Sequence, residues 1–333
     1  MTNLFTEVKI PKSQTVINYN SRLMFVGSCF ADNIGSMFSD NKFRCVINPL
    51  GTLYNPLSIK ILFDILTSDR KITEKDFFFY RNLYSSYLMH GDFSDCDLNN
   101  AVSKANKSIE TARNFLKNTK IVFITLGTAF VYYLNQSGLP VANCHKQPSE
   151  LFTRKMLTVE QATKALQQIC SSIASINPDV RIVLTVSPIR HIADGAIENT
   201  LSKSTLLLSA DNVAKFLGFV EYFPSYEIMI DELRDYRFYE SNLTHPSTTA
   251  REIIFDKITS TFCPTAVTDN IKNVSTFMKS VNHKIIAPDS AETITFAEKQ
   301  LQRALQLEKQ IQGLDLSTEK EYFNKIINRI KQS

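Results

Sequence analysis

Three apolar runs, each about the length of one strand, constrain the fold of this chain more than any other feature. They cover residues 23–26, 121–126 and 181–186, and they are mostly aliphatic or aromatic, as in strands buried on both faces. Amphipathic stretches with apolar residues at helical spacing separate them. Alternating strands and helices predict a parallel sheet that is covered by helices on both faces.

Polar residues directly follow each of these strands. Ser28 follows the first, Gly127 and Thr128 follow the second, and Ser187 follows the third. Sheets of this class place their sites at the carboxyl ends of the strands, so we expect these segments to converge at one edge.

The rest of the α/β region is predicted as helices, one further short strand and one irregular segment. The sequence Thr158-Val159-Glu160-Gln161 has the pattern of a capping box and predicts a helix start. Residues 69–100 are mixed in character, which predicts irregular structure with short strands. The predicted helices cover residues 101–117, 158–176, 202–217 and 246–262, and the further strand covers residues 219–223.

Composition changes after residue 264. Residues 291–312 are rich in Glu, Lys and Gln, with apolar residues near helical spacing, and Thr318–Glu321 has the pattern of a second capping box. We therefore divide the chain into an α/β domain, residues 1–264, and a C-terminal helical extension, residues 265–333. A helical hairpin there would pack against the main domain or against a partner chain, so a homo-oligomer formed through these helices is one expectation.

Composition excludes several classes of protein. Of the 333 residues 44% are hydrophobic, which is enough for a large core, and the formal net charge is only +4. That balance favours neither nucleic acid nor an anionic membrane as a partner. No apolar run is long enough to span a bilayer, and the N-terminus lacks the pattern of a secretory signal, so we expect a cytoplasmic protein without membrane insertion. The six cysteines are scattered without a C-x-x-C pair, so we expect neither a disulfide scaffold nor a zinc site.

Ser28 and His245 are the first candidates for chemistry. A serine between a strand and a helix N-terminus lies where backbone N–H groups and the helix dipole favour a developing oxyanion. Its hydroxyl is a weak nucleophile and needs a nearby base. His245 precedes Pro246, which favours an extended backbone at the histidine. The alternatives are that Ser28 caps the helix and that His245 is a surface or capping residue.

Several segments together resemble the GSCFA family, which takes its name from the pentapeptide found here at residues 27–31. The resemblance extends over roughly residues 20–262, with motifs in order and at plausible spacing. It implies a place in the SGNH, or GDSL-like, hydrolase group. That group implies a flavodoxin-like three-layer α/β/α sandwich, with a mainly parallel sheet, and ester hydrolysis or acyl transfer, often on sugar-linked acyl groups. The segments that carry the resemblance are Gly27–Ala31, Asn48–Pro56, Thr125–Ala129, Asn143–Lys146, Thr185–His191, Pro224–Met229, Asp231–Tyr239 and Thr244–Ser247.

The resemblance assigns roles to three residues of this chain. Ser28 matches the nucleophile, and His245 matches the base. Gly51 matches a glycine whose N–H helps to form the oxyanion hole together with the N–H of Ser28. Such a donor contributes about 2.7–4 kcal/mol in the transition state.

Two positions depart from the pattern of the wider group. Where the group has an asparagine two residues after a glycine, this chain has Ala129, so Asn143 or the hydroxyl of Thr128 is left as the replacement donor. Where the group has an aspartate three residues before the histidine, this chain has Asn242. An amide oxygen still holds the imidazole tautomer but brings no negative charge. In a serine triad the Asp-to-Asn change lowers turnover by about 10⁴-fold. The carboxylates that remain as substitutes are Asp231, Asp235 and Glu240.

Other polar residues are weighed as rivals or as substrate contacts. Cys29 is a rival nucleophile, although core packing is the favoured interpretation. Cys144 and His145 are interpreted as a loop that lines the site, with His145 as a substrate contact. Arg190 and His191 either bind an anionic part of the substrate or belong to a salt-bridged loop.

The function expected from the sequence is a serine esterase or deacylase that forms an acyl-Ser28 intermediate, which water then hydrolyses. The expected partner is a small-molecule or carbohydrate acyl ester, and no metal or organic cofactor is implied. An acyltransferase, in which an alcohol replaces water, uses the same site. The alternative from another class is a non-catalytic ligand-binding module that retains the SGNH fold.

Overall fold

The computed structural model describes residues 6–285 and 290–331, and the chain divides into two compact units. The first comprises the described residues up to Pro11, Arg22–Gly35 and Cys45–Asp256. The second comprises Lys12–Ser21, Ser36–Arg44 and the described residues from Lys257 onward. The second unit therefore combines two N-terminal segments with the C-terminal helices.

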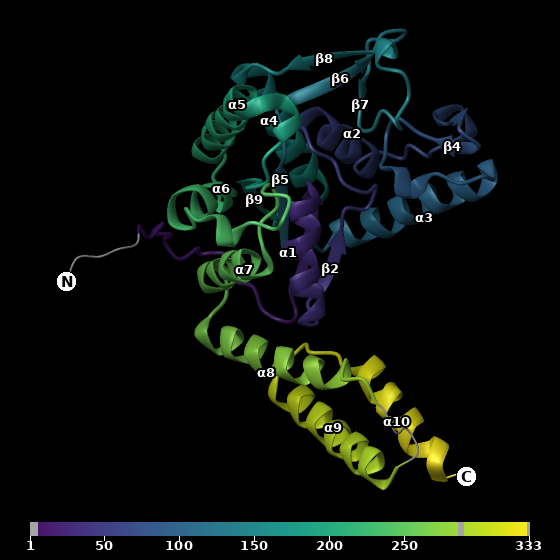
Figure 1. The fold of residues 1–333 in the computed structure, drawn as a ribbon, viewed down its shortest axis with the longest axis vertical. Coiled ribbons are helices and arrows are strands. Elements are labelled where there is room, and N and C mark those ends of the chain that lie inside the picture. Colours follow the sequence, from purple (N-terminus) through teal and green to yellow (C-terminus); the bar gives the residue numbers. More distant parts are fainter. Residues whose placement is uncertain (1–5, 286–289, 332–333) are drawn as a thin grey trace. The chain divides into compact units, whose positions relative to one another are not determined.

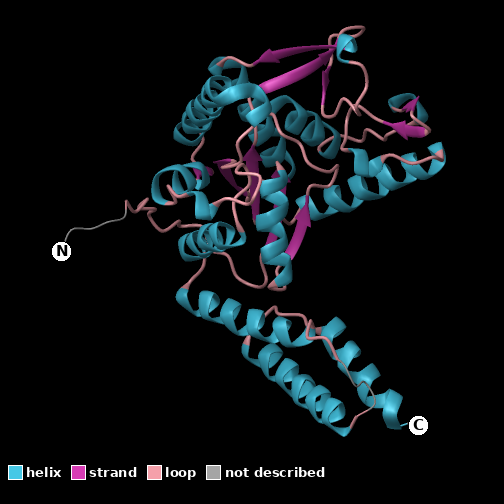
Figure 2. Ribbon diagram, in the orientation of Figure 1, coloured by secondary structure: helices cyan, strands magenta, loops and turns pink. Residues whose placement is uncertain are grey.

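A five-stranded sheet forms the core of the first unit (Figure 1, Figure 2). The strands β1 and β5, β5 and β9, and β9 and β10 pair in parallel, and β2 lies beside β1 at the edge. Counted along the chain among themselves, the five strands have the spatial order 2-1-3-4-5, which is the flavodoxin-like order. The strands predicted over residues 121–126 and 181–186 are confirmed at both ends. The sheet consists of β1 (Arg22–Gly27), β2 (Arg44–Ile47), β5 (Ile121–Leu126), β9 (Arg181–Val186) and β10 (Val220–Tyr222).

Helices cover both faces of this sheet, and all six residues of β5 are buried. Alternate residues such as Met24 and Ile124 join one hydrophobic core with the helices α2, α3, α4 and α5. On the opposite face the rings of Phe25 and Phe123 stack at 4.9 Å between centroids, and α1 packs there through Gly35. The predicted three-layer sandwich is confirmed. These helices are α1 (Cys29–Asp40), α2 (Pro56–Leu66), α3 (Leu98–Leu116), α4 (Val159–Ile176) and α5 (Gly195–Phe216).

Local signals set some helix ends and not others. The predicted capping box at Thr158 and Gln161 is present at the start of α4. The helix α5 begins at Gly195, well before the predicted start at Ser202. The apolar pattern missed its first turns because Ile197 and Leu201 are exposed there and break the helical periodicity of apolar residues.

Antiparallel strands also belong to this unit, and the sequence did not predict those outside residues 69–100. β6 pairs with β7 on one side and with β8 on the other, and β3 and β4 form a hairpin within residues 69–100, where short strands were expected. Short elements then lead to α7. These strands and helices are β3 (Phe78–Tyr80), β4 (Leu83–Ser85), β6 (Phe130–Leu134), β7 (Pro140–Val141), β8 (Phe152–Met156), α6 (Ser225–Glu227), a π-helical turn (Ile228–Glu232) and α7 (Thr248–Phe262). Turns of 3-10 helix lie at Glu74–Asp76, Gly91–Phe93, Ser149–Leu151, Ile192–Asp194 and Tyr236–Phe238.

The second unit is helical and has its own aromatic contacts. It contains α8 (Thr265–Val281), α9 (Ala291–Gln310) and α10 (Ser317–Lys331). The ring of Phe323 lies 6.3 Å from that of Phe277 and 6.2 Å from that of Phe296, between centroids. The predicted extension is confirmed as helical. The predicted capping box at Thr318–Glu321 is wrong, because α10 has already begun at Ser317.

Within residues 6–285 and 290–331, no helix combines the length and the apolar character needed to cross a membrane. The same residues contain no group of three or more His, Cys, Asp or Glu side chains arranged to hold a metal ion.

Candidate active site

Ser28 lies where β1 ends and α1 begins. Gly27 before it has a φ of +135°, and a Cβ at that position would overlap the carbonyl oxygen of Thr125 on the neighbouring strand. Only glycine therefore lets the chain turn so tightly off the strand. The N–H of Ser28 donates to the same Thr125 oxygen at 3.1 Å, and its Oγ accepts from the N–H of Phe30 at 3.3 Å. The serine thus caps α1, as one interpretation of the sequence held, and it is only 1% exposed.

Gly51 lies in a loop that Asn48 connects by hydrogen bonds to the turn at Gly27 and Ser28. The Oδ1 of Asn48 accepts from the N–H of Gly27 at 2.8 Å, and its Nδ2 donates to Asp32 at 2.7 Å. The N–H of Gly51, expected in the oxyanion hole, donates to the backbone oxygen of Asn48 at 2.7 Å. The loop of Gly51 and the turn of Ser28 are thus linked by hydrogen bonds. However, the N–H groups of both residues, which were expected to bind the oxyanion, already donate to backbone carbonyl oxygens. The sequence did not identify Asn48, although it opens the Asn-Pro-Leu-Gly turn.

Thr128, one of the two candidates for the missing oxyanion donor, follows β5, and its side chain contacts α5. Its Oγ1 lies 3.1 Å from the Oγ of Ser202, which also accepts from the N–H of Ala129 at 2.8 Å. The N–H groups of Gly127 and Thr128 both donate to the carbonyl oxygen of Tyr54, at 2.8 and 2.9 Å. Ser202 therefore satisfies the backbone at Ala129, where the wider group has its asparagine.

Lys203 is a buried cation at the carboxyl edge of the sheet, and the sequence did not point to it. Its side chain is 1% exposed, and its Nζ donates to the carbonyl oxygens of Gly127 at 2.6 Å and Ser187 at 2.7 Å. These two oxygens lie just beyond β5 and β9, so the lysine ties the two strand ends together. Burial lowers the pKa of Lys203 to about 7.

His191 lies near this lysine, and its ring stands perpendicular to that of Tyr54 at 6.1 Å. Burial, and next the charge of Lys203, lower the pKa of His191 to about 4. The imidazole is therefore neutral at pH 7, which is poorly suited to binding an anion by charge.

Asn143 and His145 lie in a separate loop. The Oδ1 of Asn143 accepts from the N–H of His145 at 2.8 Å, and the Nε2 of His145 lies 2.8 Å from the carbonyl oxygen of Ser86. Segment 86–90 leads to His90, whose Cβ packs against Gly51. In the part of the chain that the structure describes, neither Asn143 nor His145 is hydrogen-bonded to the Ser28 turn, so their roles remain predictions.

His245 lies on a loop that is joined to the end of β9. The N–H of Arg190 donates to the carbonyl oxygen of Thr244 at a long 3.4 Å, and the N–H of Glu240 donates to that of His245 at 2.8 Å. This places the His245 loop beside the segment that follows β9. Across residues 6–285 and 290–331, no hydrogen bond joins the Oγ of Ser28 to His245, so their pairing stays a prediction.

Asn242 contacts the imidazole through its amide nitrogen. Its Oδ1 accepts from three donors: the N–H of Thr244 at 2.9 Å, the Oγ1 of Thr244 at 2.8 Å and the N–H of His245 at 3.0 Å. These donors fix the orientation of the amide, so the Nδ2 faces the Nδ1 of His245 at 2.9 Å. An amide N–H that donates to Nδ1 favours the tautomer with its proton on Nε2. The sequence predicted the contact but the opposite direction of the hydrogen bond.

The carboxylates considered as substitutes are engaged in ion pairs. Glu240 pairs with Arg251 at 3.2 Å, and Asp231 pairs with Arg234 at 3.0 Å. Asp235 pairs with an arginine of its own loop. None of the three is hydrogen-bonded to the ring of His245 in the described ranges.

Cysteine nucleophiles are disfavoured. Burial, and next the charge of Asp32, raise the pKa of the Cys29 thiol, and burial raises the pKa of Cys144 to about 11. Both side chains are therefore thiols at neutral pH, and the thiolate is the nucleophilic form.

Comparison with known proteins assigns the chain at the level of family. The profile of the GSCFA family matches residues 22–258, and that of the GSCFA domain protein, C-terminal domain, matches residues 276–329. Among curated proteins, none matches the chain. The solved structures that match the chain include the following two, both at low identity. An acetyl xylan esterase from the rumen bacterium Butyrivibrio proteoclasticus is 11% identical with a TM-score of 0.37, over 74% of this chain and 64% of that one, which is under two thirds. The periplasmic domain of a lipopolysaccharide acetyltransferase from Salmonella ser. Paratyphi A is 15% identical with a TM-score of 0.36, over 74% and 84%.

Proposed function

The chain belongs to the GSCFA family, and from that premise we propose that it cleaves small acyl esters with Ser28 as the nucleophile. The observation that carries the proposal is the position of Ser28 at the carboxyl end of a central strand and the N-terminus of a 12-residue helix. The turn at Gly27, which packs against the carbonyl oxygen of Thr125 on β5, holds Ser28 in this position. A hydroxyl at such a place meets an acyl carbonyl within reach of helix N–H groups and the helix dipole.

In the proposed reaction the Oγ of Ser28 attacks the acyl carbonyl and His245 takes its proton. The ester C–O bond then breaks, the leaving alcohol receives the proton, and water hydrolyses the acyl-serine. The N–H groups of Ser28 and Gly51 are the proposed oxyanion donors, which requires each to share or leave its present carbonyl partner. Transfer to a second alcohol, in place of water, is the variant of the same reaction.

The experiment is active-site labelling with a fluorophosphonate probe, together with turnover of 4-nitrophenyl acetate. We expect both in the wild-type protein and neither in Ser28→Ala, with strong losses in His245→Ala. Cys29→Ala is the matched control next to the nucleophile and should keep labelling. Wild-type labelling or turnover no higher than in Ser28→Ala would overturn the proposal. Adding a sugar or glycerol and measuring its acetylated product separates transfer from hydrolysis.

A second function, ligand binding without catalysis, is favoured by one observation. The Nδ2 of Asn242 faces the Nδ1 of His245 at 2.9 Å, and the Oγ1 of Thr244 lies 3.0 Å from the same nitrogen. Because an amide nitrogen only donates, its contact favours the neutral ring with the proton on Nε2, the nitrogen that should accept one. Asn242→Asp separates the two functions, because a carboxylate oxygen there accepts from Nδ1–H and leaves Nε2 free.

For an esterase, Asn242→Asp should raise kcat by up to about 10⁴-fold, the size of the reverse change in a serine protease triad. Asn242→Ala, which supplies no acceptor, is the control and should not raise it. A protein that stays inactive as Asn242→Asp, and is not labelled, is a binding module.

A further inference from the structure

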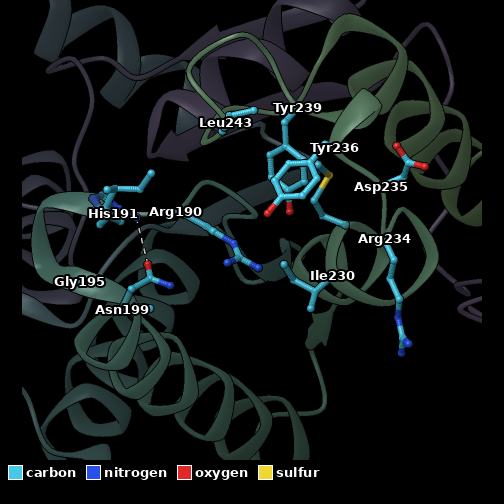
Figure 3. A pocket seen from close by; sticks show the side chains of 13 residues that line it. Arg190, His191, Gly195, Asn199, Ile230, Arg234, Asp235, Tyr236, Tyr239 and Leu243 are labelled. Carbon is cyan, nitrogen blue, oxygen red and sulfur yellow. Dashed lines mark hydrogen bonds between the residues drawn. The ribbon is translucent and has the colours of Figure 1, made fainter.

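A pocket of about 590 Å³ lies beside the His245 loop, in a size range typical of small-molecule sites (Figure 3). It is formed between the segment after β9, the start of α5 and residues 229–243. Two apolar side chains of its lining are exposed, Ile192 at 61% and Leu243 at 50%. Exposed apolar groups gathered around one cavity mark a binding surface.

Arg190 brings an unbalanced positive charge into this pocket. Its guanidinium points into the cavity in Figure 3, and among the described residues it forms neither an ion pair nor a side-chain hydrogen bond. The other charged groups of the lining are already paired, Arg234 with Asp231 and Asp235 with Arg237. Among residues 6–285 and 290–331, Arg190 is therefore the charged group of this lining without an ion-pair partner. A guanidinium binds carboxylate oxygens in a bidentate geometry.

Two tyrosines supply the apolar wall opposite this charge. The rings of Tyr236 and Tyr239 lie 6.4 Å apart between centroids, and Tyr236 is 77% exposed. In Figure 3 their hydroxyl groups point toward Arg190. A ring that lies on these tyrosines would place a carboxylate substituent at the guanidinium.

The pocket is connected to the base of the proposed reaction. The N–H of Arg190 donates to Thr244 next to His245, and Leu243 lines the cavity. Because His245 hands its proton to the leaving alcohol, the pocket beside it holds the alcohol part of the ester. From this arrangement we infer that the pocket binds a carboxylate on a ring-bearing alcohol, with Arg190 as its counter-ion. The assignment to the alcohol part rests on the proposed function, whereas binding of the carboxylate does not.

Binding is measured first, in Ser28→Ala protein, by isothermal titration calorimetry at neutral pH. The probes are 4-hydroxybenzoate and glucuronate, and their neutral counterparts are methyl 4-hydroxybenzoate and glucose. We expect a carboxylate to bind more tightly than its neutral counterpart and to lose about 10- to 100-fold in affinity in Arg190→Gln. Binding of one carboxylate alone supports the inference and identifies the ring as aromatic or pyranose.

Arg70→Gln is the control, because this guanidinium pairs with Asp76 and neither residue belongs to the pocket lining. It should change affinity by less than about threefold, as expected for a screened surface charge. If neither carboxylate binds, or if Arg190→Gln binds both as well as the wild-type residue does, the inference is wrong.

Kinetics in the otherwise wild-type protein then test the link to catalysis. The substrates are 4-acetoxybenzoate and its neutral methyl ester. In Arg190→Gln the ratio of the KM for the anion to the KM for the neutral ester should rise by about tenfold or more. If binding depends on Arg190 but no ester is turned over, the pocket stands and the esterase proposal fails. If both esters are turned over with the same KM in both proteins, the carboxylate does not lie in this pocket during the reaction.

Discussion

Lys203 makes the stability of this protein depend on pH in a way that one substitution can isolate. Its pKa is lowered from 10.5 to about 7 by burial. The unfolded chain keeps the proton up to about pH 10.5, while the folded protein releases it above about pH 7. At this residue the unfolded state therefore binds more protons in this window, so the contribution of Lys203 to the free energy of unfolding rises with pH there.

The magnitude follows from the two pKa values. Their difference, at about 1.36 kcal/mol for each pH unit, corresponds to about 5 kcal/mol over the whole window. Between pH 7.0 and 8.5 the lysine is half to almost wholly deprotonated in the folded state, so its contribution to the rise is about 1.5 kcal/mol. Lys203→Met keeps much of the volume and has no proton to release, so this contribution should vanish.

The assay is urea unfolding followed by far-ultraviolet circular dichroism at pH 7.0, 7.5, 8.0 and 8.5. Lys215→Met is the matched control, because Lys215 is on the same helix, pairs with Asp211 and is 75% exposed. The wild-type protein and the control should gain about 1.5 kcal/mol more than Lys203→Met across this range. The same pH dependence in all three proteins, or a wild-type stability that falls with pH relative to Lys203→Met, would refute the reasoning. Lys203→Gln replaces the methionine variant if the latter does not fold.

Three further substitutions test the packing that positions the site and the second unit. Gly27→Ala should destabilise the first unit by at least about 2 kcal/mol, since a Cβ meets the carbonyl of Thr125 at a positive φ, and thermal unfolding measures it; a melting temperature equal to wild type would contradict the turn geometry. Ser202→Ala leaves the N–H of Ala129 without its acceptor and should cost about 1–3 kcal/mol in urea unfolding, whereas a neutral result would mean that another acceptor takes over. Phe277→Ala, at a fully buried ring, should cost the second unit about 3–5 kcal/mol by hydrogen exchange of its helices, and unaltered exchange would exclude the proposed core.

The sheet could be predicted because its signal is local. Residues 121–126 and 181–186 are apolar on both faces and end where Gly127 and Pro188 interrupt them, so the strand limits are present in the sequence itself. The family resemblance then implied the sandwich fold, and the strand order bears it out. The start of α5 and the strands β6 to β8 could not be predicted in this way. The middle of β8, for example, is exposed, so no buried run marks it.

The burial of Lys203 could not be predicted from apolar periodicity. A lysine within a helix normally faces water, and Lys203 has no sequence feature to distinguish it. What places it in the core is a hydrogen-bonding requirement elsewhere. The carbonyl groups of Gly127 and Ser187 lie just past the ends of β5 and β9, and they need a donor from outside the sheet. Those two groups come from segments far apart in the chain, so only the assembled sheet reveals the need.

The contact between Asn242 and His245 also could be predicted only in part from the sequence. The spacing of three residues was enough to predict that the two side chains meet, and they do. The direction of the hydrogen bond depends on how many donors compete for a single amide oxygen. Two groups of Thr244 and the N–H of His245 occupy that oxygen, which leaves only the amide nitrogen for the ring. An aspartate in this loop would have a second oxygen to spare for the imidazole, and an asparagine does not. The same backbone turn that brings Asn242 to the histidine therefore presents the amide nitrogen, a donor, to the ring. Under the proposed function, position 242 is for this reason the one at which substitution should change activity most favourably.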